Sequence, residues 1–257
     1  MSHPTSLVVT GAASGIGRAV CELAAQADHH VHALDVDADG LATTVDLVRA
    51  AGGQATAYQV DVTAADRVES VFAAIATGPP LAGVFASAGA DIGGAAHELD
   101  PTTFRRVLEI NTTGTFLVVQ QALRAMIAAN GGSVVLCGSP AAQVGFAAGG
   151  ATAYGASKGA IASMTRTLAV DYARHGIRVN AVVPGPTDTA LMWANVAPED
   201  RTALRHQIAE EVPLGRFAHP AEIAQCVLWL VSDRSSYTTG SLIGCDGGVL
   251  AKSSISF

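Results

Sequence analysis

Charged side chains are scarce in this sequence, and basic ones are fewer than acidic ones. Only 14% of the 257 residues are charged, and the formal net charge is −7. Proteins that bind nucleic acid or an anionic membrane surface carry clustered Lys and Arg, which this composition does not supply. We therefore expect neither nucleic acid nor a membrane as a partner.

Cysteine is also infrequent, and its positions form no pattern. The four thiols are far apart and form no Cys-x-x-Cys: Cys21, Cys137, Cys226 and Cys245. Such spacing indicates reduced core thiols in a cytosolic protein. Residues 1–6 carry no basic stretch leading into an apolar core, so we expect no signal peptide and a cytoplasmic location.

Long regular apolar runs and clusters of metal ligands are missing as well. Residues 130–157 contain no charge, but seven glycines and Pro140 interrupt them, which excludes a regular spanning helix. The histidines of His29-His30-Val31-His32 have no carboxylate or cysteine at ligand spacing, so we predict no metal site. No linker or repeat divides the chain, so residues 1–257 are predicted to form one domain.

What the sequence does contain is an alternation of short apolar runs with longer helical patterns. This order predicts an α/β fold, a doubly wound parallel sheet of about seven strands with helices on both faces. The predicted strands are 7–10, 31–35, 56–60, 81–86, 133–137, 178–183 and 241–245. The predicted helices are 15–26, 38–51, 64–76, 101–129, 152–175 and 220–231.

A glycine-rich turn follows the first predicted strand and precedes a helix. Residues 10–17 read Thr-Gly-Ala-Ala-Ser-Gly-Ile-Gly. Glycines allow a close approach to a pyrophosphate, and the helix N-terminus offers free N–H groups. Such a turn alone is weak evidence, because any tight connection recruits glycine, but its place between strand one and a helix favours a dinucleotide.

Two acidic residues at strand ends refine this prediction. Asp35 ends the second strand, where a carboxylate can accept from both ribose hydroxyls and repel a 2′-phosphate, so NAD is expected rather than NADP. The alternative for Asp35 is a turn residue or helix cap. Asp61 ends the third strand and either accepts from the adenine amino group or caps the next helix.

Tyr154 and Lys158 are four residues apart on a predicted helix and therefore share one face. A neighbouring ammonium favours the phenolate, so we expect Lys158 to lower the pKa of Tyr154 toward working pH and make it an acid/base. An isolated Tyr-x-x-x-Lys is more often a core tyrosine beside a solvated lysine. The other motifs of the chain reverse that preference.

Taken together, these motifs resemble those of the short-chain dehydrogenase/reductase family over about residues 5–250. The matching segments are Thr10–Gly17, Asp35, Asp61-Val62, residues 86–89, Asn111, Ser139, Tyr154 with Lys158, Pro184-Gly185 leading to Thr189, and residues 246–248. The resemblance implies an NAD-dependent oxidoreductase with a catalytic tetrad of Asn111, Ser139, Tyr154 and Lys158. It implies cofactor contacts from Gly11, Ser14, Gly15, Ile16, Gly17, Asp35, Asp61, Val62, Ala88, Gly89, Tyr154, Lys158, Pro184, Gly185, Thr187 and Thr189.

The resemblance also implies roles for the four catalytic residues. Ser139 orients the substrate oxygen, and Tyr154 exchanges its proton. Lys158 holds the nicotinamide ribose, and Asn111 holds a water that links the lysine to solvent. For Thr189, a bond to the nicotinamide carboxamide and a cap on the helix starting at Ala190 are both open.

The chain departs from the family pattern after two strands. Where the family usually has an asparagine that stitches the central strands, this chain has Ala86-Ser87-Ala88-Gly89, and Ser87 is expected to replace part of that function. Tyr154 lies fifteen positions after Ser139, slightly more than the family spacing. We expect the extra length, in residues 146–152, to form a roomy loop beside the substrate.

Residues 190–211 are predicted to form a lid over the substrate crevice. Lining residues are expected from Ala141, Val144, Phe146, Leu191, Met192 and Trp193, with Ile92 nearby. These side chains favour an uncharged, mostly apolar secondary alcohol or its ketone, possibly cyclic. Leu191, Met192 and Trp193 could instead pack a short helix onto the body, and Arg201 and Arg205 could bind an anionic substrate or form a solvated helix face.

The family resemblance further implies self-association, and we expect a homotetramer through the alanine-rich helices 101–129 and 152–175. Three alternative functions remain open at this stage. They are an NADP-using 3-oxoacyl-type reductase, a non-catalytic NAD-binding regulatory protein, and an epimerase or dehydratase that keeps NAD as an internal redox group.

Overall fold

Seven strands form one parallel sheet in the computed structural model, which describes residues 5–27, 29–146, 149–194 and 196–252. They are β1 (Thr5–Thr10), β2 (His29–Asp35), β3 (Gln54–Gln59), β4 (Leu81–Ala86), β5 (Gly132–Cys137), β6 (Ile177–Pro184) and β7 (Leu242–Cys245). Their order across the sheet is β3-β2-β1-β4-β5-β6-β7, and each pairing is parallel. The predicted fold class is confirmed.

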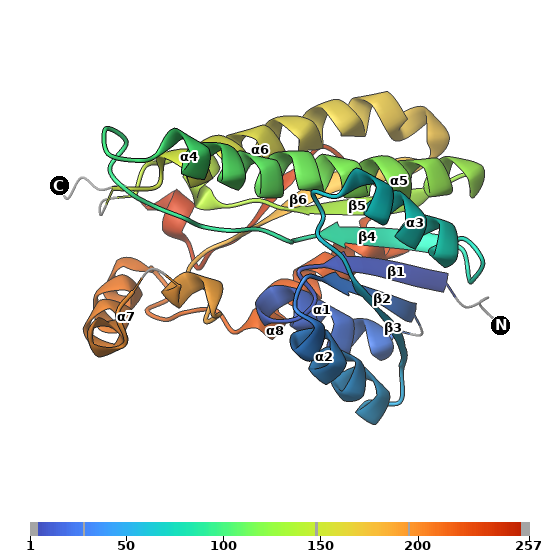
Figure 1. Ribbon diagram of the computed structural model, residues 1–257, viewed down its shortest axis with the longest axis horizontal. Coiled ribbons are helices and arrows are strands. Elements are labelled where there is room, and N and C mark those ends of the chain that lie inside the picture. Colours follow the sequence, from blue (N-terminus) through green and yellow to red (C-terminus); the bar gives the residue numbers. More distant parts are fainter. Residues whose placement is uncertain (1–4, 28, 147–148, 195, 253–257) are drawn as a thin grey trace.

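Helices cover both faces of this sheet. They are α1 (Gly15–Ala25), α2 (Ala38–Ala50), α3 (Ala65–Ile75), α4 (Pro101–Leu108), α5 (Thr115–Ala128), α6 (Thr152–Tyr172), α7 (Arg201–Glu211) and α8 (Pro220–Val231). Figure 1 shows α4, α5 and α6 on one face and α1, α2 and α8 on the other, with α7 set apart from both layers. In the described part of the chain, no helix is long and apolar enough to cross a membrane.

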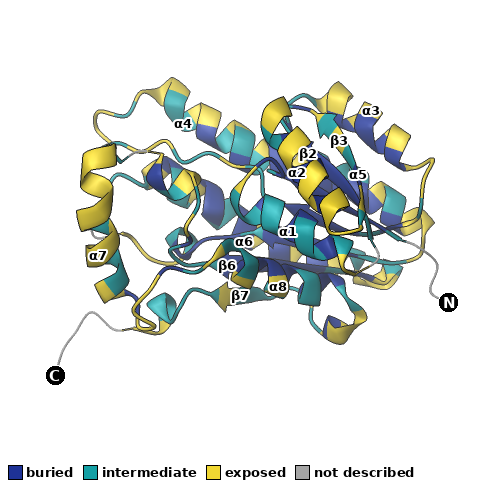
Figure 2. Ribbon diagram, turned by 90° about the horizontal axis from the view of Figure 1, so that it is seen from below, coloured by how far each residue is buried: buried dark blue, intermediate teal, exposed yellow. Residues whose placement is uncertain are grey.

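Successive residues of each central strand pack into two separate cores. Val8 and Val84 point to the core under α3, α5 and α6, whereas Leu7, Val9 and Phe85 point to the core under α1, α2 and α8. Because side chains alternate along a strand and both faces are covered, both sets must be apolar. This explains why the strands read as continuous apolar runs. Figure 2 shows these strands buried between helices whose outer faces are exposed.

The strand order places a crevice at the carboxyl ends of β1 and β4. From β1 the chain continues to β2 and β3 on one side, then returns to place β4 on the other side of β1. The connections that follow β1 and β4 lead to helices on opposite faces of the sheet, and open α/β sheets bind ligands in the crevice at such a switch point. The glycine-rich turn follows β1, and residues 87–94 follow β4.

The helix predicted over residues 101–129 is not continuous. A π-helical turn at Glu109–Gly114 separates α4 from α5. Asn111 lies in this turn, is 1% exposed, and bonds with both backbone groups of Ala90. A π turn inserts an extra residue into a helix and is common at functional sites. Here it accompanies an inward-facing amide that a regular helical pattern does not predict.

His32 is a buried titratable group without a hydrogen-bond partner. Its side chain is 4% exposed, and neither ring nitrogen is bonded in the structure. The ring lies 4.8 Å from that of His30 and 5.8 Å from that of Tyr58. Burial, with a smaller contribution from His30, lowers the pKa of His32 to about 4. The neutral form is therefore the one that the fold accommodates.

This burial predicts a loss of stability in mild acid. In the unfolded chain the pKa of His32 is near 6.5, so between about pH 6.5 and pH 4 the unfolded state binds a proton at His32 that the folded state does not bind. Stability should fall from about pH 6.5 and level off below about pH 4, by roughly 3 kcal/mol in full. In His32→Phe, unfolding midpoints measured across this range should decline less steeply than in wild type.

His97, whose side chain is 81% exposed, provides the matched control for this experiment. His97→Phe should leave the acid-dependent part of the unfolding curve unchanged. An equal slope in His32→Phe and wild type would contradict the assignment to His32.

Candidate active site

The glycine-rich turn brings two backbone segments into close contact. A Cβ on Gly17 would lie 2.1 Å from the carbonyl oxygen of Gly11, and Gly11 has φ +68°. Ser14 precedes α1 without a side-chain cap, and the first turn carries no acidic residue. The N–H groups of this turn are therefore available to an anion, together with the partial positive charge of the helix. This cradle fits a pyrophosphate.

Asp35 faces this turn. Its Oδ2 accepts from the backbone N–H of Ala13 at 3.0 Å, and its Oδ1 accepts from that of Asp37 at 3.1 Å. Each carboxylate oxygen keeps capacity for further donors. The guanidinium of Arg18 is engaged elsewhere, since it donates to the carbonyls of Ala13 and Gly40 and to the Thr44 hydroxyl. The Asp35 carboxylate therefore places a negative charge at this end of the crevice, and the Arg18 guanidinium does not bond to it.

Ser87 replaces part of the missing asparagine. Its hydroxyl donates to the carbonyl of Thr10 at 2.6 Å, and its N–H donates to the Thr10 hydroxyl at 3.0 Å. The N–H of Ala88 also donates to the Thr10 hydroxyl. These bonds join the carboxyl ends of β1 and β4. A Cβ on Gly11 would lie 3.0 Å from the nitrogen of Ala88, so the two loops are in direct contact.

Asp61 does not cap α3 through its side chain. It accepts instead from the N–H and hydroxyl of Thr63, at 2.9 and 2.8 Å, and contacts Arg106 at 3.4 Å. The Thr63 N–H contributes most to lowering the pKa of Asp61. Val62 is buried and contacts Gly114 at the π turn, while Gly89 lies against the Asn111 side chain. These residues frame the opposite side of the crevice.

The helix α6 carries Tyr154 and Lys158 on one face, as the spacing predicted. The Lys158 ammonium lies 5.4 Å from the centre of the Tyr154 ring and donates to the carbonyl of Cys137 at 2.8 Å. Lys158 is only 6% exposed. Because a buried ammonium needs a partner, this bond fixes the lysine at the end of β5.

Asn111 holds the loop after β4 against α6. Its amide nitrogen donates to the carbonyl of Ala90 at 2.9 Å and to the Ser157 hydroxyl at 3.0 Å, and its oxygen accepts from the Ala90 N–H at 2.8 Å. Ser157 in turn donates to the carbonyl of Tyr154 at 2.7 Å. In this structure Asn111 thus positions the helix that bears Tyr154 and bonds no atom of Lys158.

Ser139 lies two residues beyond β5 and starts the short 3-10 turn Pro140–Ala142. Its hydroxyl accepts from the N–H of Ala141 at 3.2 Å, and its side chain also interacts with the phenol of Tyr154. Ser139 is 6% exposed. The structure therefore brings Ser139, Tyr154 and Lys158 together at one point, with Asn111 behind them.

The predicted lowering of the Tyr154 pKa is wrong for this structure. Burial is the largest influence and raises the pKa of Tyr154, because the charged phenolate loses hydration. The Lys158 ammonium and the Ser139 hydroxyl lower it, as expected, while Cys137 and Asp91 raise it. The net direction is upward, so the phenol is held in its protonated form at neutral pH.

The loop after β6 completes the crevice. Gly185 donates its N–H to the carbonyl of Cys245 at 3.0 Å, and the Thr187 hydroxyl donates to the carbonyl of Gly185 at 2.9 Å. The Thr189 hydroxyl accepts from the N–H of Met192 at 3.4 Å, so it caps the short turn that follows. A Cβ on Gly15 would lie 3.1 Å from the Thr189 methyl group, which places this loop against the glycine-rich turn.

Trp193 follows the second of the two predicted alternatives and packs the short turn onto the body. It is 9% exposed, stacks on Phe217 at 5.4 Å, and donates to Asp188 at 3.1 Å. Arg205 lies over both rings and forms an ion pair with Asp188 at 2.5 Å. Arg201 donates to the carbonyl of Trp193. Arg205 therefore attaches the lid to the body, whereas Arg201 bonds within the lid, and both guanidinium groups are already engaged.

The remaining predicted lining residues are all at least partly exposed, and their contact with a substrate stays a prediction. Ile92, Val144, Phe146 and Leu191 are each more than 40% exposed. Ala141 and Met192 are half-buried. In the predicted loop of residues 146–152, Ala147 and Ala148 lie outside the described residues. Gly150 accepts from the N–H of Gly94 at 2.9 Å, so the two loops that carry apolar side chains meet.

The sequence interpretation missed Asp91, which lies within electrostatic reach of the catalytic groups. Asp91 is half-buried and follows Ala90, which Asn111 fixes through two hydrogen bonds. Burial raises the pKa of Asp91, and Lys158 opposes this effect. The sequence feature that could have identified Asp91 is its place in the loop after a central strand, where active-site groups collect.

The arrangement suits a nicotinamide dinucleotide. The turn of residues 14–17 offers N–H groups that would hold a pyrophosphate, the Asp35 carboxylate could accept from a ribose, and the Lys158 ammonium, beside Tyr154, could donate to a second ribose. A cavity of about 440 Å³ beside the turn is lined by Ser14, Gly15 and Thr189, together with the outer side of α1 and the start of α8.

Comparisons with known proteins agree with this geometry. A family model described as enoyl-(acyl carrier protein) reductase matches residues 11–250. The chain is 41% identical over 246 residues to cis-4-hydroxycyclohexanecarboxylate dehydrogenase of Sinomonas cyclohexanicum, which covers 95% of this chain and 96% of that protein. It is 38% identical over 251 residues to NAD-dependent glycerol dehydrogenase of Listeria innocua, with 95% and 93% covered.

Among solved structures, a variant of actinorhodin polyketide ketoreductase with NADPH has a TM-score of 0.89 at 30% identity. The match covers 97% of this chain and 99% of that one. The relatives are oxidoreductases of alcohols or ketones, and the matches extend over nearly the whole length. This chain therefore belongs to the short-chain dehydrogenase/reductase family.

Proposed function

We propose that this protein is an NAD-dependent dehydrogenase/reductase that interconverts an uncharged, mostly apolar secondary alcohol and its ketone. The observation that carries this proposal is the buried Lys158, which is fixed to Cys137 and lies 5.4 Å from the Tyr154 ring beside Ser139. A buried amine, a phenol and a hydroxyl at one point form an acid/base site. The cofactor supplies the hydride or accepts it.

Each residue has a role that its contacts support. The protonated Tyr154 donates to the carbonyl oxygen during reduction, and its phenolate accepts the hydroxyl proton during oxidation. Ser139 holds the same oxygen through its hydroxyl. Lys158 stabilises the phenolate when it forms, and Asn111 keeps α6 and the loop of Ala90 in register. The protein thus supplies position and electrostatics, which are the main terms in such catalysis.

Two features favour an uncharged substrate with a carbon ring. Asp91 adds a negative charge near Lys158, while Arg201 is bonded within the lid and Arg205 is paired with Asp188. Asp91 would therefore repel an anion, and neither arginine of the described lid residues is uncommitted. The Sinomonas relative is named for a hydroxycyclohexanecarboxylate, which supports a cyclic secondary alcohol as the substrate class. We propose that the substrate of this chain lacks the carboxylate, because the charge of Asp91 would repel it.

A non-catalytic NAD-binding role is the alternative from a different class. It requires no acid/base group, yet Ser139, Tyr154 and Lys158 all meet at one point. Formation of NADH from NAD with cyclohexanol-type alcohols, followed by absorbance, separates the two functions.

The other alternative is an NADP-using 3-oxoacyl-type reductase. Such an enzyme would instead oxidise NADPH with a 3-oxoacyl thioester.

Replacing the proposed acid/base should abolish turnover and spare cofactor binding. Tyr154→Phe removes only the hydroxyl, so kcat should fall roughly 10²–10⁴-fold while the Kd for NADH stays near the wild-type value. Tyr172→Phe, on the same helix, is the matched control and should retain activity. A Tyr154→Phe variant with near-normal turnover would rule out this residue as the acid/base.

Asp35 should determine the choice between NAD and NADP. Asp35→Ala removes both the acceptor for the ribose and the repulsion of a 2′-phosphate, so the ratio of kcat/KM for NAD over NADP should drop roughly tenfold. Asp37→Ala, which removes the cap of α2 at Gly40, controls for local destabilisation. If the ratio is the same in Asp35→Ala and wild type, Asp35 does not bind the ribose.

The pH dependence should reflect the raised pKa of Tyr154. Because the phenolate is the base for oxidation, that rate should increase with pH into the alkaline range, whereas reduction should decline there. Asp91→Asn removes a charge that raises this pKa, so the oxidation profile should move to lower pH. Asp91→Glu keeps the charge and should not move it. Coincident profiles for Asp91→Asn and wild type would contradict the interaction.

A further inference from the structure

One carboxylate oxygen in the loop after β6 holds two residues of the lid. The Oδ1 of Asp188 accepts from the indole N–H of Trp193 at 3.1 Å and from the guanidinium of Arg205 at 2.5 Å. The bond from Arg205 contributes most to lowering the pKa of Asp188, so the carboxylate is ionised at neutral pH. Asp188 therefore joins the short turn Leu191–Trp193 to the middle of α7.

Arg205 is also held by two stacked aromatic rings. The rings of Trp193 and Phe217 lie 5.4 Å apart at an angle of 27°, and the two residues are 9% and 8% exposed. The guanidinium carbon of Arg205 lies 5.4 Å from the centre of the first ring and 5.0 Å from the centre of the second. Both distances are within the range of a cation–π contact. Charge and ring contact thus fix this arginine together.

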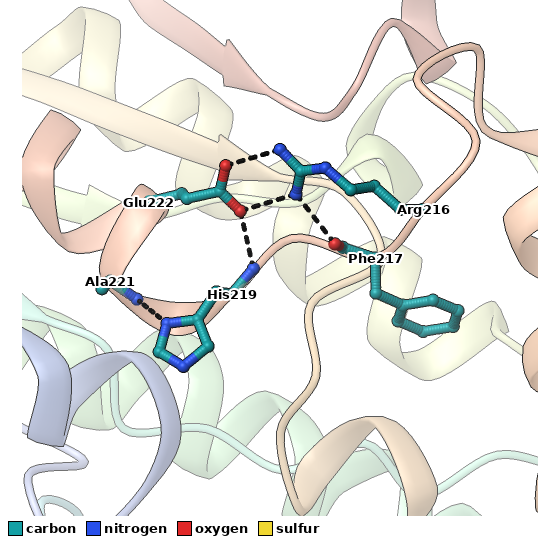
Figure 3. A network of polar contacts seen from close by, with 5 residues as sticks. All are labelled: Arg216, Phe217, His219, Ala221 and Glu222. Carbon is teal, nitrogen blue, oxygen red and sulfur yellow. Dashed lines mark hydrogen bonds and ion pairs between the residues drawn. The ribbon is translucent and has the colours of Figure 1, made fainter.

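Phe217 belongs to the body of the protein. Figure 3 shows the segment that carries it, in which Arg216 donates to the Phe217 carbonyl at 3.1 Å and to both carboxylate oxygens of Glu222 at 2.7 Å. Glu222 lies in the first turn of α8, whose inner face is buried. The N–H of Asp188 donates to the carbonyl of Ala218 at 3.0 Å. The aspartate and the phenylalanine therefore lie on adjoining segments that are both fixed to the body.

Helix α7 has little other attachment to the body. None of its residues is buried, and Figure 1 shows it apart from both helix layers. At its N-terminal end Arg201 bonds within the lid. At its C-terminal end Lys252 donates to the carbonyl of Glu211, and the following Val212 is 3% exposed. Release of Arg205 would therefore leave the helix held at its two ends and free to turn between them.

The loop that carries the aspartate also borders the proposed cofactor site. Asp188, Thr189 and Ala190 line the cavity of about 440 Å³ beside the glycine-rich turn. The lid follows the carboxyl end of β6, which is the edge of the sheet where ligands of such folds bind. Because Asp188 belongs to this wall, its bond to Arg205 holds α7 at the edge where a substrate would enter.

We propose that Asp188 is a positioning residue whose ion pair with Arg205 latches the lid, so that release of this pair lets substrate enter and product leave. The pair acts through the position of α7 and not on the reacting atoms. Its side chains remain 45% and 44% exposed, so salt screens the interaction and the latch can open readily. The effect on turnover rests on the proposed function, whereas the latch itself does not.

Fluorescence of Trp193 tests the latch without turnover. The chain has two tryptophans, so a Trp229→Phe background leaves Trp193 as the only reporter. Arg205→Met removes the guanidinium from the ring, and the acrylamide quenching constant should rise about twofold or more. With Arg205 present, raising KCl from about 0.05 to 1 M should cause a similar rise, because salt screens the ion pair. Arg205→Lys keeps the charge and should stay near the wild-type value.

Steady-state kinetics test the link to the proposed function. Arg205→Met should raise the KM for the alcohol about fivefold and leave kcat at or above the wild-type value, because the lid retains substrate less well while the reacting groups are unchanged. Asp188→Asn keeps an acceptor for Trp193 but loses the charge, so it should have the same effect. The double variant should be no worse than either single variant. Glu210→Gln removes an exposed charge elsewhere on α7 and should behave like wild type.

The two parts of the proposal fail separately. Equal quenching of Trp193 in Arg205→Met and wild type would refute the latch, and so would additive effects of Asp188→Asn and Arg205→Met on quenching. If quenching rises while the KM for the alcohol is unchanged, or if only kcat falls, the link to substrate exchange is refuted. If the wild type turns over no alcohol, the proposed function fails while quenching still decides whether the latch exists.

Discussion

The hydrogen bond from the Lys158 ammonium to the Cys137 carbonyl holds the site together. It joins α6 to the carboxyl end of β5 and thereby fixes the phenol of Tyr154 beside Ser139. The ammonium is almost fully buried, and a buried charge without a partner would cost several kcal/mol. The fold therefore specifies one position for this side chain, and Asn111 also holds α6 in place through its bond to Ser157.

Burial and charge compete at Tyr154, and burial is the stronger effect in this structure. The same packing that excludes water from the site also removes hydration from the phenolate, which raises the pKa despite the nearby ammonium. This makes the neutral phenol a ready proton donor to a ketone. Asp91 acts in the same direction, so the loop after β4 adjusts the chemistry as well as the shape of the crevice.

The lid region illustrates how far residue types alone could predict the site. The sequence placed Leu191, Met192 and Trp193 together as an apolar group, but contact with a substrate and packing against the body remained equally consistent with that pattern. The structure stacks Trp193 on Phe217 and places Arg205 over both rings. Those partners are distant along the chain, and no local periodicity indicates which of them a side chain will meet.

The sequence by itself determined the order and faces of the elements, the glycine-rich turn, Asp35 after β2, and the Tyr154–Lys158 spacing, because these depend on local geometry and on periods of two and 3.6 residues. Only the tertiary structure decided the π turn at Asn111, the raised pKa of Tyr154, the position of Asp91 and the stacking of Trp193 on Phe217. Each of these depends on burial or on contacts between residues distant in sequence, and such contacts are set by how the layers pack.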